Sequence, residues 1–264
     1  MGTRKYRRSS GFLAGEGRAV GVKVLEVKGV LECEVVARLN RFVVLVSVGG
    51  RRYRAYINNT GRLEEYLVRG RRAYCLENPP GRRTRYRLFA VSDAWSAALI
   101  DTQMQMRAFE RAAAMGAISW LQGCRVVRRN VRLGSSLIDY LLSCPEGDLY
   151  LETKSAVLRG EKRYAMYPDC PTARGRRHIK ELIEHVSRGG LGGVVFIAAL
   201  PEVDAFKPYR EGDPEIPVLL REALRVGVIV KAIAMHFELA ESAVYLDDPD
   251  LRVELDDSVA YHDG

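Results

Sequence analysis

The chain has 264 residues and a formal net charge of +8, with 47% apolar and 28% charged residues. This composition is typical of a globular protein and excludes a chain that is disordered throughout. No apolar run is long enough to predict a transmembrane helix, and Glu16, Arg18 and Lys23 interrupt the apolar core that a signal peptide would need. We therefore expect a soluble cytoplasmic protein with no membrane partner.

The first third of the chain predicts a basic β-barrel preceded by a loose arm at residues 1–30. β-Branched side chains alternate in part with polar ones, and Gly49 and Gly50 are typical of a hairpin turn. The expected strands are residues 35–48, 51–57, 71–77 and 84–91. Several short strands with glycine and proline between them indicate one barrel domain at residues 31–92.

Residues 93–264 predict a second domain, of mixed α/β class. In chain order we expect a helix at 101–121, strands at 125–133, 136–142 and 149–156, a helix at 172–188, a strand at 194–200, a helix at 217–226 and a strand at 228–235. Thr172 suits the N-cap of the second helix, and Gly189 and Gly190 suit its end. The core order is therefore αβββαβ.

Charge is distributed unevenly along the chain. Residues 1–92 contain 20 Lys and Arg against 7 Asp and Glu, whereas residues 238–264 contain 1 against 9. This asymmetry points to a polyanionic partner such as nucleic acid, and ion-pair networks are the alternative explanation. The acidic tail is expected either to be solvated or to fold back on the basic barrel as a mimic of nucleic acid.

The five cysteines predict neither a zinc site nor a disulfide framework, because they are widely spaced and no CxxC pair occurs. We expect free thiols that pack as small apolar residues. The cysteines are Cys33, Cys75, Cys124, Cys144 and Cys170.

Two acids and a lysine on the predicted strands are the candidate catalytic residues. Glu152 and Lys154 are two residues apart and point to one face of their strand. If the strands pair through the turn at 145–148, Asp139 lies beside Glu152. Two converging carboxylates suit Mg²⁺ or Mn²⁺, and Lys154 can orient the attacking water and neutralise charge on a phosphate. An ion pair on the strand surface is the alternative.

This D…ExK spacing, on the second and third strands of an αβββαβ order, is the signature of the PD-(D/E)XK nuclease superfamily. The restriction-endonuclease-like core of that superfamily is the fold that we expect for the second domain. Glu110 on the preceding helix is the candidate third metal ligand.

Three sequence blocks resemble the sugar fermentation stimulation (SfsA) family. They are residues 38–42 (RLNRF) with 58–61 (NNTG), residues 138–140 (IDY) with 152–155 (ETKS), and residues 167–182 (YPDCPTARGRRHIKEL). The resemblance spans residues 35–255. It implies an N-terminal OB-fold domain joined to a PD-(D/E)XK-type domain, in a DNA-binding protein with a nuclease-like, metal-dependent site.

The chain departs from the family pattern at three positions. Asn58 replaces a proline, Thr153 replaces a valine, and Ala173 replaces a frequent glutamate. We expect the first two changes to be harmless, since neither position needs to present a charge. The third removes a carboxylate next to the expected site.

The start of the helix at 172–188 is a candidate phosphate site. Free backbone N–H groups, the helix dipole and the guanidinium groups of Arg174, Arg176 and Arg177 favour an anion there. A solvated helix face is the alternative. His178 is either a general acid or base, a phosphate ligand, or a packing residue. Asp169 either binds metal, caps the helix, or ends a turn.

The barrel carries further candidate contacts to nucleic acid, because OB folds bind strands through aromatic side chains in basic grooves. Alternation places Tyr53 on the face opposite Arg52 and Arg54. The segment from Asn59 to Gly61 is either a turn that shapes the barrel or a direct contact. The candidates are Arg38, Arg41, Arg52, Tyr53, Arg54, Asn59 and Thr60.

The sequence thus supports a DNA-binding protein with a metal-dependent nuclease site for DNA or RNA. The competing hypothesis is a non-catalytic DNA-binding or regulatory protein of sugar metabolism that uses a nuclease-like scaffold. A sugar-metabolising enzyme ranks lowest, because neither GxGxxG nor GxxxxGK[ST] occurs. The apolar strands leave room for a homodimer.

Overall fold

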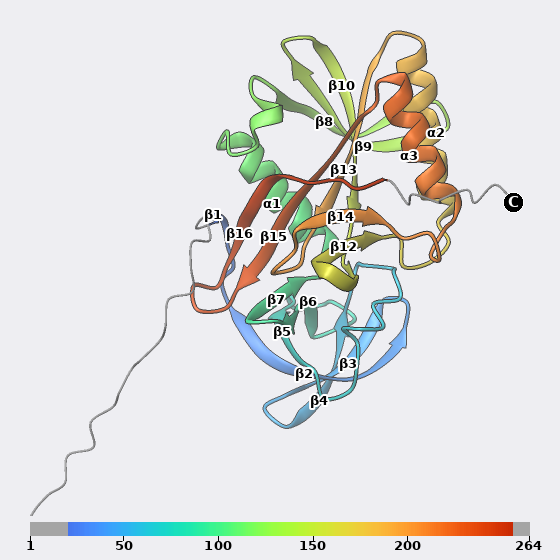
Figure 1. The fold of residues 1–264 in the computed structure, drawn as a ribbon. Helices are drawn as coiled ribbons and strands as arrows, with labels where there is room; N and C mark the ends of the chain where they lie inside the picture. Colours follow the sequence, from blue (N-terminus) through green and yellow to red (C-terminus); the bar gives the residue numbers. More distant parts are fainter. Residues whose placement is uncertain (1–20, 256–264) are drawn as a thin grey trace, which may run out of the picture.

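The computed structural model describes residues 21–255 (Figure 1). The N-terminal part contains β1 (Val22–Glu26), β2 (Val30–Asn40), β3 (Val43–Val48), β4 (Arg51–Tyr56), β5 (Arg72–Glu77), β6 (Tyr86–Asp93) and β7 (Ser96–Leu99). The C-terminal part contains α1 (Thr102–Ala114), β8 (Arg125–Leu133), β9 (Ser136–Cys144), β10 (Gly147–Ser155), β11 (Leu158–Arg159), β12 (Tyr164–Tyr167), α2 (Ala173–Ser187), β13 (Leu191–Ala198), β14 (Ala205–Pro208), α3 (Glu215–Val226), β15 (Ile229–Glu238) and β16 (Ala243–Leu251). Two short 3₁₀ helices are Ser119–Leu121 and Glu161–Arg163.

Strands β2 to β6 form a closed, OB-like barrel. β2 pairs with β3 and β5, β3 pairs with β4, and β5 pairs with β6, all antiparallel. The parallel pairing of β4 with β6 closes the barrel. The predicted barrel is therefore confirmed, but its first predicted strand, residues 35–48, is two strands. Asn40 Oδ1 accepts a hydrogen bond from Phe42 N at 2.9 Å and so turns the chain between β2 and β3.

Both ends of the described chain are more ordered than the sequence analysis expects. Residues 22–26 are not a loose arm, because β1 pairs antiparallel with β16 and buries Val24. Residues 243–251 are not a solvated tail or a mimic on the barrel, because β16 pairs with both β1 and β15. β16 begins with an apolar run and ends with three acids before Leu251, and its pairing on both edges buries Ala243, Val244, Leu246 and Leu251. The rest of the predicted arm and of the acidic tail lies outside the described residues.

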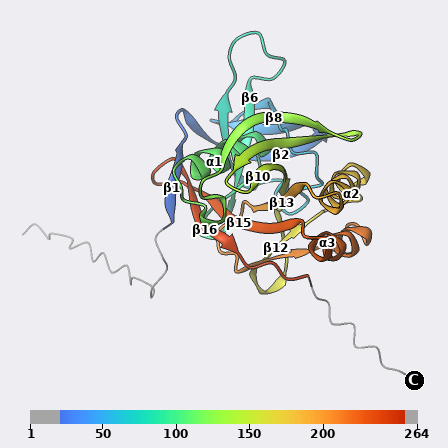
Figure 2. The same ribbon diagram turned by 90° about the horizontal axis from the view of Figure 1, so that it is seen from above.

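The second domain has the predicted αβββαβ core. β13 lies between β10 and β15 and is parallel to both, while β9 and β8 continue the sheet in antiparallel pairing. Helix α1 covers one face of this sheet, and α2 and α3 cover the other (Figure 2). β13 is buried from Gly192 to Ala198 because it has a strand on each side and helices on each face. The predicted restriction-endonuclease-like fold is confirmed.

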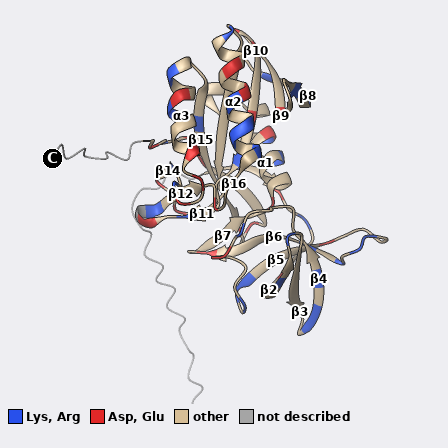
Figure 3. Ribbon diagram, turned by 90° about the vertical axis from the view of Figure 1, so that its right-hand side faces the viewer, with Lys and Arg blue, Asp and Glu red and all other residues tan. Residues whose placement is uncertain are grey.

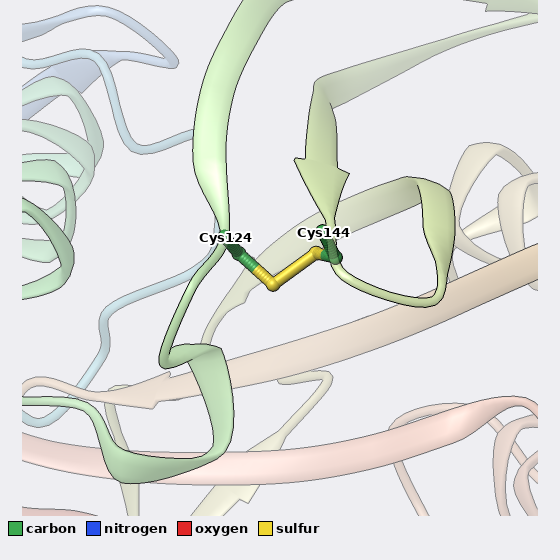
Figure 4. The surroundings of a disulfide bond; sticks show 2 residues. All are labelled: Cys124 and Cys144. Atoms are coloured by element: carbon green, nitrogen blue, oxygen red, sulfur yellow. A yellow bond between two sulfur atoms is a disulfide. The ribbon is translucent and has the colours of Figure 1, made fainter.

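The structure contains a disulfide bond that the sequence analysis does not predict. Cys124 and Cys144 are joined across the ends of the β8–β9 hairpin (Figure 4). Arg125 pairs with Ser143, so the two cysteines face each other at the open end of the hairpin. The expectation of free thiols is wrong for this pair. Within residues 21–255, Cys33, Cys75 and Cys170 are free.

A three-stranded sheet of β11, β12 and β14 lies where the barrel meets the second domain (Figure 1). Its strand β12 leads directly to the loop before α2 and so helps to position that helix. Among the described residues, no helix is both long and apolar enough to span a membrane.

Candidate nuclease-like site between the two domains

Asp139 and Glu152 come together from neighbouring strands. β9 and β10 pair antiparallel as far as Leu151 and Tyr140, and the next residues on the two strands are the two acids. Asp139 N donates a hydrogen bond to Glu152 Oε2 at 3.2 Å. Because directly opposed residues of a ladder project to the same face, both carboxylates lie on the side of the sheet that α2 covers.

Glu152 is the centre of a buried cluster of charges. It is 2% exposed, and its Oε1 accepts hydrogen bonds from Lys154 Nζ and His178 Nδ1. Burial alone would raise the pKa of Glu152, but the positive charge of Lys154 and the bond from His178 outweigh it and hold the pKa below its usual value. Glu152 also raises the pKa of Lys154 against the opposing effect of burial. The lysine and the glutamate therefore stabilise each other's charged forms.

His178 is fixed by contacts on both ring nitrogens. Arg174 Nε donates to His178 Nε2 at 3.3 Å, so the ring proton lies on Nδ1 and points to Glu152. The imidazole is 1% exposed. It therefore orients the glutamate from inside the protein and does not reach the surface as a phosphate ligand would.

Asp139 has the opposite electrostatic response to Glu152. Burial and the nearby negative charge of Glu152 raise its pKa. Thr153 lowers it only in part, by donating from its backbone N at 2.8 Å and from its Oγ1 at 2.6 Å to Asp139 Oδ2. The two carboxylates repel each other when both are ionised, so a cation bound between them would be stabilised.

The residues present fit a hard divalent cation with an incomplete protein shell. Within residues 21–255, no group of three or more His, Cys, Asp or Glu side chains is arranged to hold a metal ion. Mg²⁺ in proteins commonly uses one or two carboxylates and fills its other positions with water and phosphate oxygens. Asp139 and Glu152 match that pattern. Ser155, which follows Lys154 at the end of β10, has a buried Oγ without a hydrogen-bond partner.

Glu110 does not join the two acids. Its oxygens accept hydrogen bonds from Tyr140 Oη at 2.9 Å and from Arg129. Tyr140 is next to Asp139 in β9, and adjacent strand residues project to opposite faces. The structure therefore places Glu110 with Tyr140 on the α1 side of the sheet, away from Glu152 and His178.

The arginines at the start of α2 differ in availability. Thr172 Oγ1 accepts from Gly175 N at 3.0 Å, which confirms Thr172 as the N-cap. Arg176 is bound to the buried Asp213 at 2.6 Å and so holds α2 in place. Arg174 and Arg177 are exposed, and Arg177 Nε donates to Ser136 Oγ at 3.3 Å.

A cleft of about 210 Å³ lies between the two domains next to this cluster. Arg41, Asn59 and Thr60 line it from the barrel, and Ser155 and Tyr167 line it from the second domain. The side chain of Asn59 is used locally, since it accepts from Gly61 N and donates to Ile100 O. Arg41 and Thr60 are exposed.

Asp169 connects the domains at the same cleft. Its Oδ2 accepts from Leu63 N of the barrel at 3.1 Å, so it neither caps α2 nor joins Asp139 and Glu152. Gly61 is required at this approach, because a Cβ there would lie 2.6 Å from Asp169 Oδ2. Arg38 supports the same loop by donating to Gly61 O at 2.7 Å, and is thereby a structural residue of the barrel.

The outer barrel surface carries exposed arginines on the β3–β4 hairpin (Figure 3). Arg52 and Arg54 are exposed, whereas Tyr53 is half-buried and packs edge-on against Tyr86 with ring centroids 5.2 Å apart. The aromatic ring therefore stiffens the barrel, and the arginines form its basic surface.

Two residues of the site escape the sequence reasoning. Ser155 follows Lys154, and its missing hydrogen-bond partner can be seen only in three dimensions. Tyr167 is packed against α2 where Gly175 permits close approach, since a Cβ there would lie 2.5 Å from Tyr167 Oη. Both lie within sequence blocks that resemble the family, which is the signal that could have found them.

Comparisons with known proteins agree with this architecture. A family model described as "SfsA N-terminal OB domain" matches residues 36–100, and one described as "Sugar fermentation stimulation protein RE domain" matches residues 103–241. Sugar fermentation stimulation protein homologs of Pyrococcus furiosus and Archaeoglobus fulgidus are each 48% identical, over 85% and 88% of this chain and 96% and 99% of their own lengths.

A solved structure shows the same fold. The structure of Pyrococcus furiosus SfsA in complex with Ca²⁺ is 46% identical, with a TM-score of 0.85, and the match covers 88% of this chain and 99% of that one. The two family models match consecutive parts of the chain, the relatives match over nearly their whole length, and the solved structure has the same fold. The chain belongs to the sugar fermentation stimulation (SfsA) protein family.

Proposed function

We propose that the protein is a metal-dependent nuclease that hydrolyses phosphodiester bonds in DNA or RNA at the cleft between its two domains. The observation that carries the proposal is the contact of Glu152 with both Lys154 and His178, directly beside Asp139. An ion pair between Glu152 and Lys154 alone would not need the second carboxylate of Asp139 beside it. A nuclease needs converging acids and a lysine.

Each residue of the cluster has a distinct role in this proposal. Asp139 and Glu152 would hold Mg²⁺ or Mn²⁺, which when bound would polarise a phosphoryl oxygen and favour attack by water. Lys154 neutralises charge on the phosphate and orients the water. His178 is a positioning residue that holds the Glu152 carboxylate in place, and Arg174 and Arg177 bind the phosphate.

The barrel supplies the surface that binds the nucleic-acid strand. Arg41 and Thr60 line the cleft, and Arg52 and Arg54 extend the basic surface away from it. Exposed guanidinium groups bind phosphates without selecting a sequence. Because this attraction releases counterions, we expect the affinity to fall steeply as the salt concentration rises.

The test is cleavage of end-labelled single- and double-stranded DNA and RNA by the full chain with Mg²⁺, with Mn²⁺ and with EDTA. We expect Asp139→Asn and Lys154→Met to slow cleavage by about 100-fold or more, the usual effect of removing a group that stabilises transition-state charge. Lys180→Met is the matched control, since Lys180 is exposed on α2 and pairs only loosely with Glu215 at 3.7 Å. Cleavage at the parent rate by either site variant refutes the assignment.

A second function is favoured by one observation. The charge of Glu152 is balanced by Lys154, and His178 donates a hydrogen bond to the same carboxylate, as in a purely structural network. A non-catalytic DNA-binding or regulatory protein would show binding that depends on salt, with no cleavage under any of the metal conditions. That result would replace the nuclease proposal with this second function.

A further inference from the structure

A larger cavity, of about 550 Å³, lies apart from the nuclease-like site. It is formed by β15, β16, the β6–β7 turn and the loop between β13 and β14, and none of the residues assigned to the nuclease-like site lines it. β7, β15 and β16 are neighbours where the barrel meets the second domain (Figure 1). Cavities of this size at domain junctions commonly bind small organic ligands.

The wall of this cavity is strongly acidic. Among the described residues that line it, six are carboxylic acids and none is lysine or arginine. The acids are Glu202, Asp204, Glu238, Glu241, Asp247 and Asp248. Some have partners at the rim, such as Lys23 on Glu241 at 3.0 Å, yet the overall charge of the wall favours a cation.

A buried histidine supplies a second, independent indication of a ligand. His236 lines the cavity and is 4% exposed. Its Nδ1 lies 2.7 Å from Asp247 Oδ2, so Nδ1 carries a proton, and in the neutral imidazole Nε2 is an acceptor. Nε2 has no hydrogen-bond partner and lies 3.7 Å from Glu238 Oε2, beyond bonding distance. A buried acceptor without a donor is the state that a ligand N–H would satisfy.

Aromatic rings complete the wall. Trp95 lies edge-on to His236 with ring centroids 4.9 Å apart and is 54% exposed at the cavity mouth. Tyr245 is stacked near the same imidazole, at 6.0 Å. Aromatic faces beside carboxylates favour ammonium and guanidinium groups. A bare metal ion fits less well, because no three metal-ligating side chains converge among residues 21–255 and the cavity is much larger than an ion.

We propose that this cavity binds an organic cation that carries N–H donors, namely a primary ammonium or a guanidinium group. The donor bonds to His236 Nε2, the charge is balanced by Glu238 and Asp248, and the carbon chain lies against Trp95. Two sources have this chemistry. One is a free aliphatic polyamine. The other is a Lys or Arg side chain from residues 1–20, since Gly21, which follows them, lines the cavity.

The test is isothermal titration calorimetry, in which spermidine is titrated into the full chain and the dissociation constant is measured. We expect one saturable site, and we expect Trp95→Ala and Asp248→Asn each to weaken binding by about fivefold or more, as the loss of a partly desolvated cation contact would. His236→Phe removes the acceptor but leaves a ring in the core. Asp148→Asn is the matched control for charge, because Asp148 is exposed near the start of β10 and does not line the cavity.

A second variant distinguishes the two sources. It replaces the basic residues of the first twenty, Arg4, Lys5, Arg7, Arg8 and Arg18, with glutamine. Tighter spermidine binding by this variant identifies the chain's own side chains as the occupant, and unchanged binding identifies a free amine. The proposal is overturned if Trp95→Ala and Asp248→Asn bind spermidine as Asp148→Asn does, if no saturable site exists in the parent or the glutamine variant, or if Zn²⁺ or Mn²⁺ binds there and spermidine does not displace it.

Discussion

Asp101 joins the barrel to the second domain, and its loss should destabilise the whole chain. It is 1% exposed and is the N-cap of α1, with Oδ1 accepting from Met104 N at 2.8 Å. Asn58 Nδ2 donates to the same oxygen at 2.9 Å, and Arg87 forms an ion pair with the carboxylate. Asn58 Oδ1 also accepts from Thr102 N at 3.0 Å. The proline of the family pattern could make neither bond, so Asn58 is a structural residue of this chain.

The expected cost of Asp101→Ala follows from these contacts. Loss of an N-cap costs about 1 kcal/mol, and breaking one partner of a buried ion pair costs about 3–5 kcal/mol. The Arg87 side chain is 24% exposed, so water can solvate part of the stranded guanidinium, and the second cost should be at its lower end. We expect the free energy of unfolding to fall by about 3–4 kcal/mol.

Urea unfolding measured by fluorescence and by circular dichroism checks this magnitude. Asp101→Asn keeps an acceptor for the cap but loses the ion pair with Arg87, so its loss should be smaller than that of Asp101→Ala by about the 1 kcal/mol of the cap. Asp148→Asn, at an exposed position near the start of β10, should change the free energy of unfolding by less than about 0.5 kcal/mol. A loss below about 1 kcal/mol for Asp101→Ala would show that Arg87 and Asn58 find other partners, and would contradict the assigned cost of the broken ion pair.

Three further outcomes are expected. Cys124→Ser opens a loop with a sequence separation of 20 and should lower the free energy of unfolding by about 3 kcal/mol. A reductant should destabilise the parent but have little further effect on the variant. An equal effect of the reductant on both proteins would contradict this role of the disulfide. Thr153→Val removes the hydrogen bond from Oγ1 to Asp139, which lowers the pKa of Asp139, so this pKa should rise further in the variant. Carbon NMR titration of the carboxyl group measures it, and an unchanged or lower pKa would be inconsistent with the bond. The lowered pKa of Glu152 contributes stability that is complete above its usual value of about 4.3 and is lost as the pH falls through the folded-state value. Lowering the pH from about 5 to 3 should therefore destabilise the parent more than Glu152→Gln, as measured by thermal unfolding at each pH. Parallel dependences of the melting temperature on pH in the two proteins would argue against a lowered pKa of Glu152.

Local pattern was sufficient for much of the site. The spacing of two between Glu152 and Lys154 places them on one face of a strand, and the short turn before β10 brings Asp139 beside them. Thr172 was predictable as the N-cap of α2 because capping depends on residues only three apart. The Cys124–Cys144 bond was within reach of the same reasoning, since both lie ten residues from the Gly134 turn of one hairpin.

Contacts between distant segments were outside that reach. The sequence predicted Glu110 on a helix, but not which face of the sheet that helix covers. Because α1 covers the face that carries Tyr140, Glu110 accepts a hydrogen bond from Tyr140. Arg176 reads as a phosphate ligand until Asp213, 37 residues away, is found bound to it. His236 gives no signal in the sequence, because its partner and its cavity are assembled from β16 and the barrel turn.

The family, the core order αβββαβ and the D…ExK cluster could be predicted from the amino-acid sequence, because they depend on periodicity and on residues near one another in the chain. Which acids and arginines remain available for a ligand depends on the packing of distant segments. A buried charge must be paired with whichever opposite charge the packing brings near, and that partner can come from any part of the chain.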